Sequence, residues 1–536
     1  MKLLYALLLI TLFTQPITAQ TQLGQDIDGE AIDDYSGVVA LDGNRLAIGA
    51  PFNDGTGSRA GHVRVFEWNG TAWNQLGVDI DGEAAGDFFG WSVSLDGNRL
   101  AVGADRNNGN TGHVRVFEWN GTSWNRLGLD IDGAATDDYS WTSVSLDGNR
   151  VAIGAIGNDD NGADAGHVRI YEWNGTAWAQ LGADIDGEAA IDEFGFSVSL
   201  DGARVAIGAQ GNDGNGNGSG HVRVYEWSGT TWNQLGMDID GEAILDQSGV
   251  SVSLDGYRLA IGGYGNDGNG SESGHVRVYE WSGSTWNQLG ADIDGEAAED
   301  ISGESVSLDG HLLAIGASLN DGNGNGSGHV RVYEWNGTAW TQLGLDVDGE
   351  AAGDRAGESV SLSGGRLAIG APRNDATGSN AGHDRVFQFC TNALSTDRQT
   401  SCGAFTWIDG NTYTANNNTA RFIIPGRAAN GCDSIVTLDL TINQPANGTD
   451  TQTACNAFTW IDGNTYTSSN NTASFTIAGG AANSCDSIVT LDLTIHTLDT
   501  MVNQNGTLLT ANQAGATYQW IDCNNGNTAI LGAVAQ

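Results

Sequence analysis

The 536-residue chain carries 66 acidic against 22 basic residues, a formal net charge of −44, with 79 glycines, 5 prolines and 40% apolar residues. This length exceeds what one compact core normally holds, and the apolar content with 17 tryptophans argues against a disordered chain. The acidity argues against nucleic acid and anionic membranes as partners, because both attract basic surfaces.

Residues 1–19 have the pattern of a cleaved secretory signal. Lys2 precedes an apolar run from Leu3 to Phe13, and the small residue Ala19 stands before Gln20. That run is too short for a membrane anchor, which needs about 20 residues, and no later run is longer. We therefore expect an exported protein, secreted or at the cell surface, with no membrane insertion after cleavage.

Residues 20–389 repeat one pattern seven times. Successive copies start 51 to 54 residues apart, which indicates a repeat architecture. The copies start at Leu23, Leu76, Leu127, Leu181, Leu235, Leu289 and Leu343.

Each copy predicts four short strands, named A to D here. A tight Asp-Gly turn joins strand A to strand B, and a tight Ser-Gly or Asn-Gly turn joins strand C to strand D. A polar loop rich in Gly and Asn joins strand B to strand C. In the fifth copy the predicted strands are Ser251–Leu254, Arg258–Gly263, His275–Trp281 and Thr285–Gly290.

Four antiparallel strands repeated seven times predict an all-β fold, a seven-bladed β-propeller with one blade per copy. The seventh copy stops at Phe389 without a strand D, and the N-terminal residues Thr21–Gly24 match strand D of the sixth copy, Thr341–Gly344. We expect the N-terminal strand to complete the last blade, because closure removes exposed sheet edges.

Two short motifs carry a resemblance to a known family. Phe89–Gly90 precedes a strand A, and Gly49–Pro51 ends a strand B. On these motifs residues 21–389 resemble FG-GAP repeat proteins, which include the integrin alpha-subunit propeller. Many members of that family carry an Asp-rich calcium loop between strands A and B, where this chain has a short turn such as Asp96–Asn98.

Chain direction alternates in each blade, so the D–A and B–C connections emerge on one face, the loop face. We expect an unknown protein or glycan ligand there, because loops carry function more often than strands do. Its acidic loops resemble calcium sites, since Ca²⁺ takes six to eight oxygens; solvated turn-forming residues are the alternative. The candidate Ca²⁺ ligands are Asp184, Asp186, Glu188, Asp213, Asp238, Asp240, Glu242, Asp267, Asp292, Asp294, Glu296 and Asp321.

A histidine opens strand C in every copy. Equivalent positions lie far apart around a ring, so we expect a repeated structural hydrogen bond rather than a shared metal site. Paired tryptophans such as Trp227 and Trp232 bracket the C–D turn and predict cross-strand or inter-blade packing, with carbohydrate stacking as the alternative. The histidines are His62, His113, His167, His221, His275, His329 and His383.

Catalysis has little support in the sequence. The repeats lack cysteine, a GxSxG elbow, an HExxH motif and a P-loop, and their carboxylates recur identically from copy to copy. We therefore expect no catalytic residue and no enzyme. Glycoside hydrolysis by two of the carboxylates is the enzymatic alternative.

A different repeat follows Phe389. Copies of AFTWIDGNTYT lie in residues 390–443 and 444–496, and their Thr, Val and Ile alternation predicts small β-sandwich-like modules. These modules resemble tandem Ig-like repeats of Bacteroidota surface proteins. Residues 497–536 resemble the start of a further, truncated module. The resemblance implies a surface protein, with type IX secretion as one route.

Cysteine spacing predicts one disulfide inside each module. In an exported chain, two cysteine pairs separated by the same interval of 30 positions are read as disulfides, with zinc as the weaker alternative. The predicted pairs are Cys402 with Cys432 and Cys455 with Cys485, which leaves Cys390 and Cys523.

These features favour an exported adhesion or interaction protein, with the propeller as binding head and the modules as stalk. A carbohydrate-binding or carbohydrate-processing accessory protein is one alternative, since exposed tryptophan faces or loop carboxylates could serve it. A structural surface-layer component is the other, because the copies are so uniform.

Overall fold

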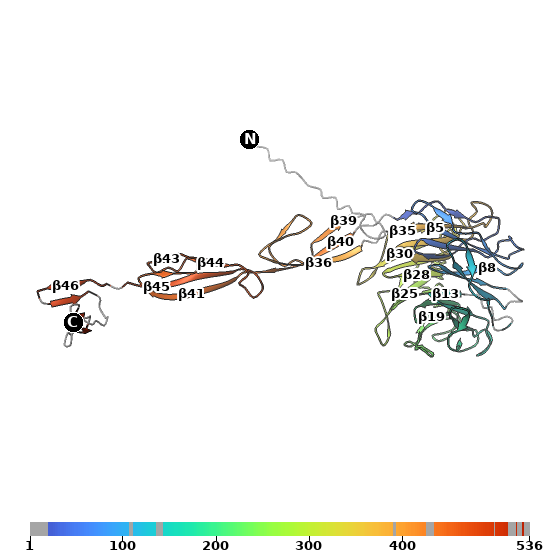
Figure 1. The fold of residues 1–536 in the computed structure, drawn as a ribbon. Coiled ribbons are helices and arrows are strands. Elements are labelled where there is room, and N and C mark those ends of the chain that lie inside the picture. Colours follow the sequence, from blue (N-terminus) through green and yellow to red (C-terminus); the bar gives the residue numbers. More distant parts are fainter. Residues whose placement is uncertain are drawn as a thin grey trace, which may run out of the picture. The chain divides into compact units, whose positions relative to one another are not determined.

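The computed structural model describes residues 20–106, 111–133, 135, 143–389, 393–424, 434–497, 499–506, 508–512, 521–522 and 528–529. The chain divides into two compact units, residues 1–391 and 392–536, and every regular element in the described ranges is a strand (Figure 1). A helix with the length and apolar character of a membrane span is absent from the described residues. The predicted signal segment, residues 1–19, lies outside them.

One blade illustrates the first unit. Its sheet has the antiparallel order A-B-C-D, which confirms the four predicted strands. A fifth short strand pairs with the start of strand C, where the sequence predicted only a loop. Ile239 is buried, so the chain returns to the sheet after strand D to cover this side chain. The strands are β18 (Ser197–Asp201), β19 (Arg204–Ala209), β20 (His221–Trp227), β21 (Trp232–Gln234) and β22 (Ile239–Asp240).

The same sheet occurs seven times. The other A strands are β3 (Val38–Asp42), β8 (Phe89–Asp96), β13 (Ser143–Asp147), β23 (Ser251–Asp255), β28 (Ser305–Asp309) and β33 (Ser359–Ser363). The other B strands are β4 (Arg45–Ala50), β9 (Arg99–Ala104), β14 (Arg150–Ala155), β24 (Arg258–Gly263), β29 (Leu312–Ala317) and β34 (Arg366–Ala371). The other C strands are β5 (His62–Trp68), β10 (His113–Trp119), β15 (His167–Trp173), β25 (His275–Trp281), β30 (His329–Trp335) and β35 (His383–Gln388).

The D strands of the first six blades are equally short. Besides β21 they are β6 (Trp73–Gln75), β11 (Trp124–Arg126), β16 (Trp178–Gln180), β26 (Trp286–Gln288) and β31 (Trp340–Gln342). The remaining fifth strands are β2 (Ile27–Asp28), β7 (Ile80–Asp81), β12 (Ile131–Asp132), β17 (Ile185–Asp186), β27 (Ile293–Asp294) and β32 (Val347–Asp348).

The N-terminal strand β1 (Thr21–Gln22) completes the seventh blade, as predicted. It pairs antiparallel with β35, and the Leu23 amide donates to the Val386 carbonyl at 2.7 Å. Strand β2, on the same N-terminal segment, pairs with the start of β35. Two parts of the chain more than 350 positions apart therefore share one sheet.

Serine hydroxyls join the innermost strands of neighbouring blades. The Leu254 amide donates to Ser199 Oγ at 2.9 Å, and the same bond joins the Leu41 amide of the first blade to Ser361 Oγ of the seventh. The alternating serines of strand A thus face the next blade rather than water. Because the bond also joins the last blade to the first, the first unit is a closed seven-bladed β-propeller.

The apolar core lies between neighbouring blades. Val222 and Val224 of the fourth blade cluster with Leu259 and Ile261 of the fifth, and the other seams repeat this arrangement. Strand B is almost wholly buried, which explains its continuous apolar sequence. Burial of this kind contributes roughly 25 cal/mol per Å² of apolar surface, so the seams are the main source of stability.

The paired tryptophans have both predicted packing roles. Trp227 and Trp232 face each other across β20 and β21 with ring centroids 5.3 Å apart. Trp232 Nε1 donates to the Leu181 carbonyl of the preceding blade at 2.8 Å, and a Cβ at Gly182 would lie 2.9 Å from Trp227 Cζ3. The rings are thus committed to inter-blade contacts.

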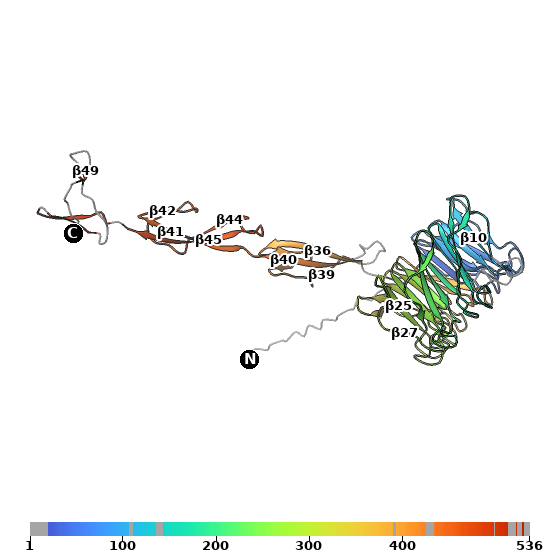
Figure 2. The ribbon, with the colours of Figure 1, turned by 90° about the horizontal axis from the view of Figure 1, so that it is seen from below.

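The second unit begins with two similar modules, each a three-stranded sheet and a two-stranded hairpin (Figure 2). In each sheet the first and last strands run parallel, and Trp407 or Trp460 is buried in the core. The first module has β36 (Ala393–Cys402), β37 (Phe405–Thr406), β38 (Thr412–Tyr413), β39 (Arg421–Ile424) and β40 (Ser434–Asn443). The second has β41 (Ala446–Cys455), β42 (Phe458–Thr459), β43 (Thr465–Tyr466), β44 (Ser474–Ile477) and β45 (Ser487–His496). Two further hairpins follow, β46 (Val502–Asn505) with β47 (Leu508–Ala511) and β48 (Ile521–Asp522) with β49 (Thr528–Ala529).

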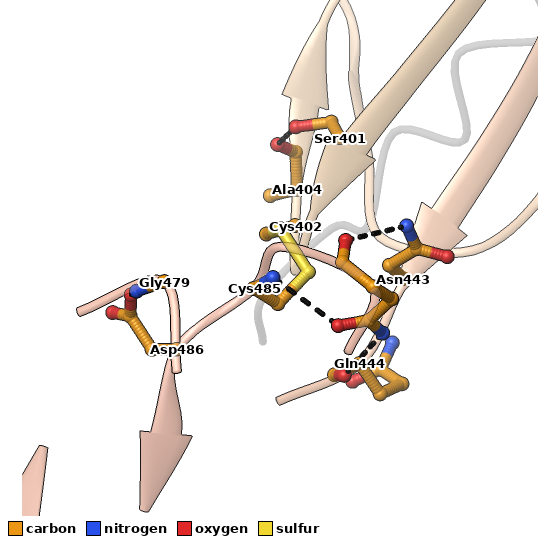
Figure 3. The surroundings of a disulfide bond; sticks show 9 residues. Ser401, Cys402, Ala404, Asn443, Gln444, Gly479, Cys485 and Asp486 are labelled. Atoms are coloured by element: carbon orange, nitrogen blue, oxygen red, sulfur yellow. Dashed lines mark hydrogen bonds between the residues drawn. A yellow bond between two sulfur atoms is a disulfide. The ribbon is translucent and has the colours of Figure 1, made fainter. Parts of the chain in front are cut away.

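The predicted disulfide pairing is wrong. Cys402 of the first module bonds Cys485 of the second, with Cα atoms 5.6 Å apart, and Cys455 is an exposed free thiol (Figure 3). This bond excludes both predicted pairs, because each would need Cys402 or Cys485. Cys432, Cys390 and Cys523 lie outside the described residues.

The parallel register explains the error. Cys455 lies at the end of β41, opposite His496, whereas Cys485 lies just before the start of β45. A ten-residue strand spans about 33 Å, far beyond the 7 Å limit for a disulfide. Cys402 ends β36 beside Asn443, where the chain crosses to the second module. There the Asn443 side-chain amide donates to the Asn483 backbone carbonyl, and the Asn483 side-chain amide donates to the Gln444 carbonyl.

Candidate functional site

The loop face is formed where two connections pair at each seam. Strand β22 brings the D–A connection beside the start of strand C, with Asp240 opposite His221. The connection then runs along the B–C loop, since the Ser248 amide donates to the Ser219 carbonyl at 3.0 Å. Backbone hydrogen bonds thus hold the polar loops.

Three of the predicted calcium ligands close their own B–C loops. Each aspartate Oδ1 accepts a backbone N–H from five residues further on, at 2.8 to 2.9 Å. These are turn-forming contacts of the kind that Asp commonly makes. The aspartates are Asp213, Asp267 and Asp321.

The other predicted ligands divide into three positions of each connection. The first aspartates, Asp184, Asp238 and Asp292, accept a bond from a strand D glutamine. The glutamates, Glu188, Glu242 and Glu296, lie 3.4 to 3.8 Å from an arginine of the next strand C. The middle aspartates are Asp186, Asp240 and Asp294, and burial raises the pKa of the first two.

A single connection therefore does not gather its own carboxylates. Instead, the cluster combines two connections. Glu188 lies on the connection that leads into the fourth blade, Asp238 lies on the connection that follows its strand D, and both are close to His221. One ligand atom from each residue lies within 4.8 Å of the others. Glu242, His275 and Asp292 repeat this group, which we call the His–Glu–Asp cluster.

The predicted hydrogen bond of the repeated histidines is wrong for five of them. The Nε2 atoms of His62, His113, His275, His329 and His383 are buried and have no hydrogen-bond partner among the described residues. Burial first, and the arginine two positions later second, lower the pKa of these imidazoles; in the fourth blade the pKa of His221 falls to about 4. The rings are therefore neutral at physiological pH.

The blades differ at the residue just before the repeated Ser-Val-Ser-Leu segment of strand A, and these residues form the inner rim of the loop face. Since the A strands contact each other around the ring, this position surrounds the centre. The rim is aromatic or aliphatic on three blades and acidic on two. Its residues are Trp91, Phe196, Val250, Glu304 and Glu358.

An aromatic cluster stands on one side of the rim. Tyr35, Phe52, Phe88 and Trp91 form a chain of ring contacts with centroids 4.9 to 6.4 Å apart. The Arg106 guanidinium lies 5.0 Å from the Phe88 centroid, within cation–π range. Phe88 and Tyr35 occupy equivalent positions of neighbouring blades, Phe196 is the counterpart of Trp91 in the fourth blade, and the counterparts of Phe52 are not aromatic.

The acidic side of the rim has a perturbed carboxyl group. Removal from bulk water, aided by the neighbouring Glu358 carboxylate, raises the pKa of Glu304 to about 7, although Ser318 Oγ donates to it. Arg355 and Arg373 oppose the increase. Perturbed groups of this kind concentrate at functional sites.

Four segments match a model described as FG-GAP repeat, residues 25–66, 79–117, 129–171 and 181–225. Together with the seven sheets they support an FG-GAP β-propeller. No curated protein matches the chain.

The propeller also exposes apolar side chains on the D–A connections of two neighbouring seams. Ile191 is 64% exposed, and Ile244 and Leu245 are 63% and 56% exposed. Ile191 has φ 70°, a strained value for a β-branched residue. Leu245 and Glu299 have φ 64° and 69° at the equivalent position, so this conformation belongs to the repeated turn, and it is the exposure of the apolar side chains that favours a contact role.

Sequence reasoning missed the inner rim because it compared what the copies share. The signal was available in the residue before each SVSL strand, which reads Trp, Phe, Val, Glu and Glu in five blades. The sequence alone does not show that this position surrounds the centre. That follows from the serine bonds between A strands.

Proposed function

We propose that this is an exported, non-enzymatic interaction protein whose propeller binds a protein or glycan ligand at the inner rim of the loop face. The C-terminal modules act as a stalk. The observation that carries the proposal is the loss of seven-fold repetition at the rim, where the aromatic cluster stands. The side chains that recur in strands A to D maintain the ring, whereas the residue at the rim differs from blade to blade.

The chemistry of the rim suits recognition. Aromatic rings offer a large, rigid contact area at low entropic cost, and arginines and carboxylates beside them supply direction. Ile191, Ile244 and Leu245 extend the apolar area outward along the connections. The paired tryptophans support a glycan-stacking role less well, since their rings pack between blades.

Export has separate support. Proteins with FG-GAP repeats are typically extracellular. The Cys402–Cys485 disulfide suits an oxidising compartment, since cytosolic thiols stay reduced. The signal-like residues 1–19 point in the same direction.

A binding screen with variants tests the proposal. The chain from residue 20 onward is labelled and applied to a glycan array and to purified extracellular proteins, with affinities measured by biolayer interferometry. We expect saturable binding that Trp91→Ala or Phe52→Ala weakens at least about tenfold, the loss of one hot-spot side chain.

Tyr257→Ala is the matched control, because Tyr257 is an aromatic residue 57% exposed on the opposite, hairpin face. Unfolding temperatures of all variants show that the fold is kept. Binding that survives both rim substitutions would contradict the rim as the site. A silent screen together with ordered self-assembly would favour the surface-layer alternative.

A further inference from the structure

The closing blade carries a buried histidine that faces two carboxylates without bonding to either. His383 Nδ1 lies 3.9 Å from Glu350 Oε2, and ligand atoms of His383, Glu350 and Asp26 lie within 4.8 Å of one another. The His383 side chain is 1% exposed. Neither of its ring nitrogens has a hydrogen-bond partner among the described residues.

A hydrogen bond or an ion pair does not explain this arrangement. An N–H···O bond needs about 2.7–3.2 Å between heavy atoms, so 3.9 Å is too long. A neutral imidazole carries a free lone pair on one ring nitrogen, and no described residue occupies either nitrogen of His383 with a hydrogen bond. Two donors of electron pairs at this separation suit ligands of a shared cation, since metal–ligand bonds are about 2.0–2.2 Å.

Each carboxylate is also held by its other oxygen. Glu350 Oε1 lies 3.8 Å from Arg385 Nη1, and Asp26 Oδ1 accepts a 2.6 Å bond from Gln22 Nε2. The arginine is itself fixed by its 2.6 Å bond to the Asp348 carbonyl. Such outer contacts orient metal ligands in known sites.

The first blade repeats the geometry with the equivalent residues of its own seam. His62 Nδ1 lies 4.0 Å from Glu30 Oε2, and Arg64 again lies beside the other oxygen, Oε1, at 3.7 Å. Asp79 is the third member, and Gln75 bonds its Oδ1. In both blades one glutamate oxygen faces the histidine and the other faces the arginine. This recurrence argues against a chance contact.

We propose that the His–Glu–Asp clusters bind divalent transition-metal ions of the Zn²⁺ class, through one imidazole nitrogen and two carboxylate oxygens each. Ca²⁺ and Mg²⁺ prefer all-oxygen sets, whereas imidazole suits Zn²⁺, Ni²⁺ and Cu²⁺. The glutamates are about half exposed, which leaves a path for the ion. Three protein ligands leave a fourth position for water or for a side chain of a binding partner.

The ion at the closing blade has a structural consequence. Asp26 belongs to the N-terminal segment that completes the blade, whereas His383 and Glu350 belong to the C-terminal end of the ring. A bound ion therefore joins the two ends of the propeller. Because it binds only the closed form, it stabilises closure in proportion to its concentration.

The test uses the untagged chain from residue 20 onward, freed of metal with a chelator. Zn²⁺ titration by calorimetry, ion counting by mass spectrometry and the visible spectrum of bound Co²⁺ measure binding. We expect His383→Gln to bind one ion fewer than the parent. Zn²⁺ should slow amide exchange in residues 20–28 of the parent and of His62→Gln, but not of His383→Gln.

His311→Gln is the control, because His311 is 51% exposed and lies 3.5 Å from the single carboxylate of Glu334. Its ion count should equal that of the parent. An unchanged count in His383→Gln, an equal loss in His311→Gln, or displacement of Zn²⁺ by equimolar Ca²⁺ would each overturn the proposal. Folding of every variant is checked by circular dichroism, so a lost ion is not mistaken for a lost fold.

Discussion

Asp384 is a buried carboxyl group at the seam that closes the propeller. The second residue of strand C is valine in the other six blades, but here it is Asp384, which is fully buried with Oδ1 unpartnered among the described residues. Its one hydrogen bond comes from Ser36 Oγ at 3.2 Å. We predict that Asp384→Val stabilises the protein.

The magnitude follows from proton linkage. Burial, opposed by Arg64, raises the pKa of Asp384 from 3.8 to about 8. Between these pH values the folded state holds about one proton more than the unfolded state, so the free energy of unfolding falls by about 1.4 kcal/mol per pH unit as pH rises. The loss of unfolding free energy caused by Asp384 is absent below pH 3.8 and complete above pH 8, where it reaches at most about 6 kcal/mol.

The assay is denaturant unfolding from pH 5 to 8 in buffer with a chelator, which removes any metal effect at the neighbouring His383. The stability gain of Asp384→Val over the parent should increase with pH. Asp384→Asn is the matched control: it should also remove the slope but gain less, because a buried amide is left poorly bonded. A parallel pH dependence of parent and Asp384→Val would refute the reasoning.

Three further predictions concern closure, packing and cross-linking. Removal of residues 20–24 should lower the unfolding temperature and promote aggregation, measured by light scattering, because strand C of the last blade becomes an edge; an unchanged temperature would contradict closure by β1. Gly370→Ala should cost about 1–3 kcal/mol in denaturant unfolding, since its Cβ would lie 1.8 Å from the Gly37 carbonyl oxygen, whereas Gly448→Ala, with open space around it, should be neutral. Non-reducing peptide mapping should recover Cys402 joined to Cys485; a Cys402 peptide joined to residue 432 would show that the register of the module is wrong.

The propeller could be predicted because its determinants are local or repeated. Alternation in SVSL, the apolar strand B and the tryptophans on both sides of a short turn each specify a strand or hairpin over a few residues. The ring closure could be predicted as well, since the strand missing after Phe389 is present near Thr21. The fifth strand was not predicted, because it is only two residues long and a strand of that length has no sequence pattern of its own. It is recognised only through its pairing with the start of strand C, where Ile239 lies opposite Val222.

The candidate sites depended on pairings that sequence distance does not encode. Glu188 and Asp238 share a cluster with His221 only because the connection entering a blade and the one leaving it meet at the start of strand C. The inner rim is a site only because the A strands surround a centre.

By itself the sequence determined the blades, their number, their order and the closing strand, because repetition and hydrophobic period act within one copy. The tertiary structure decided which side chains meet across copies. Cys402 bonds Cys485 rather than a cysteine of its own module because the parallel register of β36 and β40 takes the chain to the far end of the sheet. His62, His275 and His383 face carboxylates, and their Nε2 atoms have no hydrogen-bond partner among the described residues, because the packing of neighbouring blades places them there.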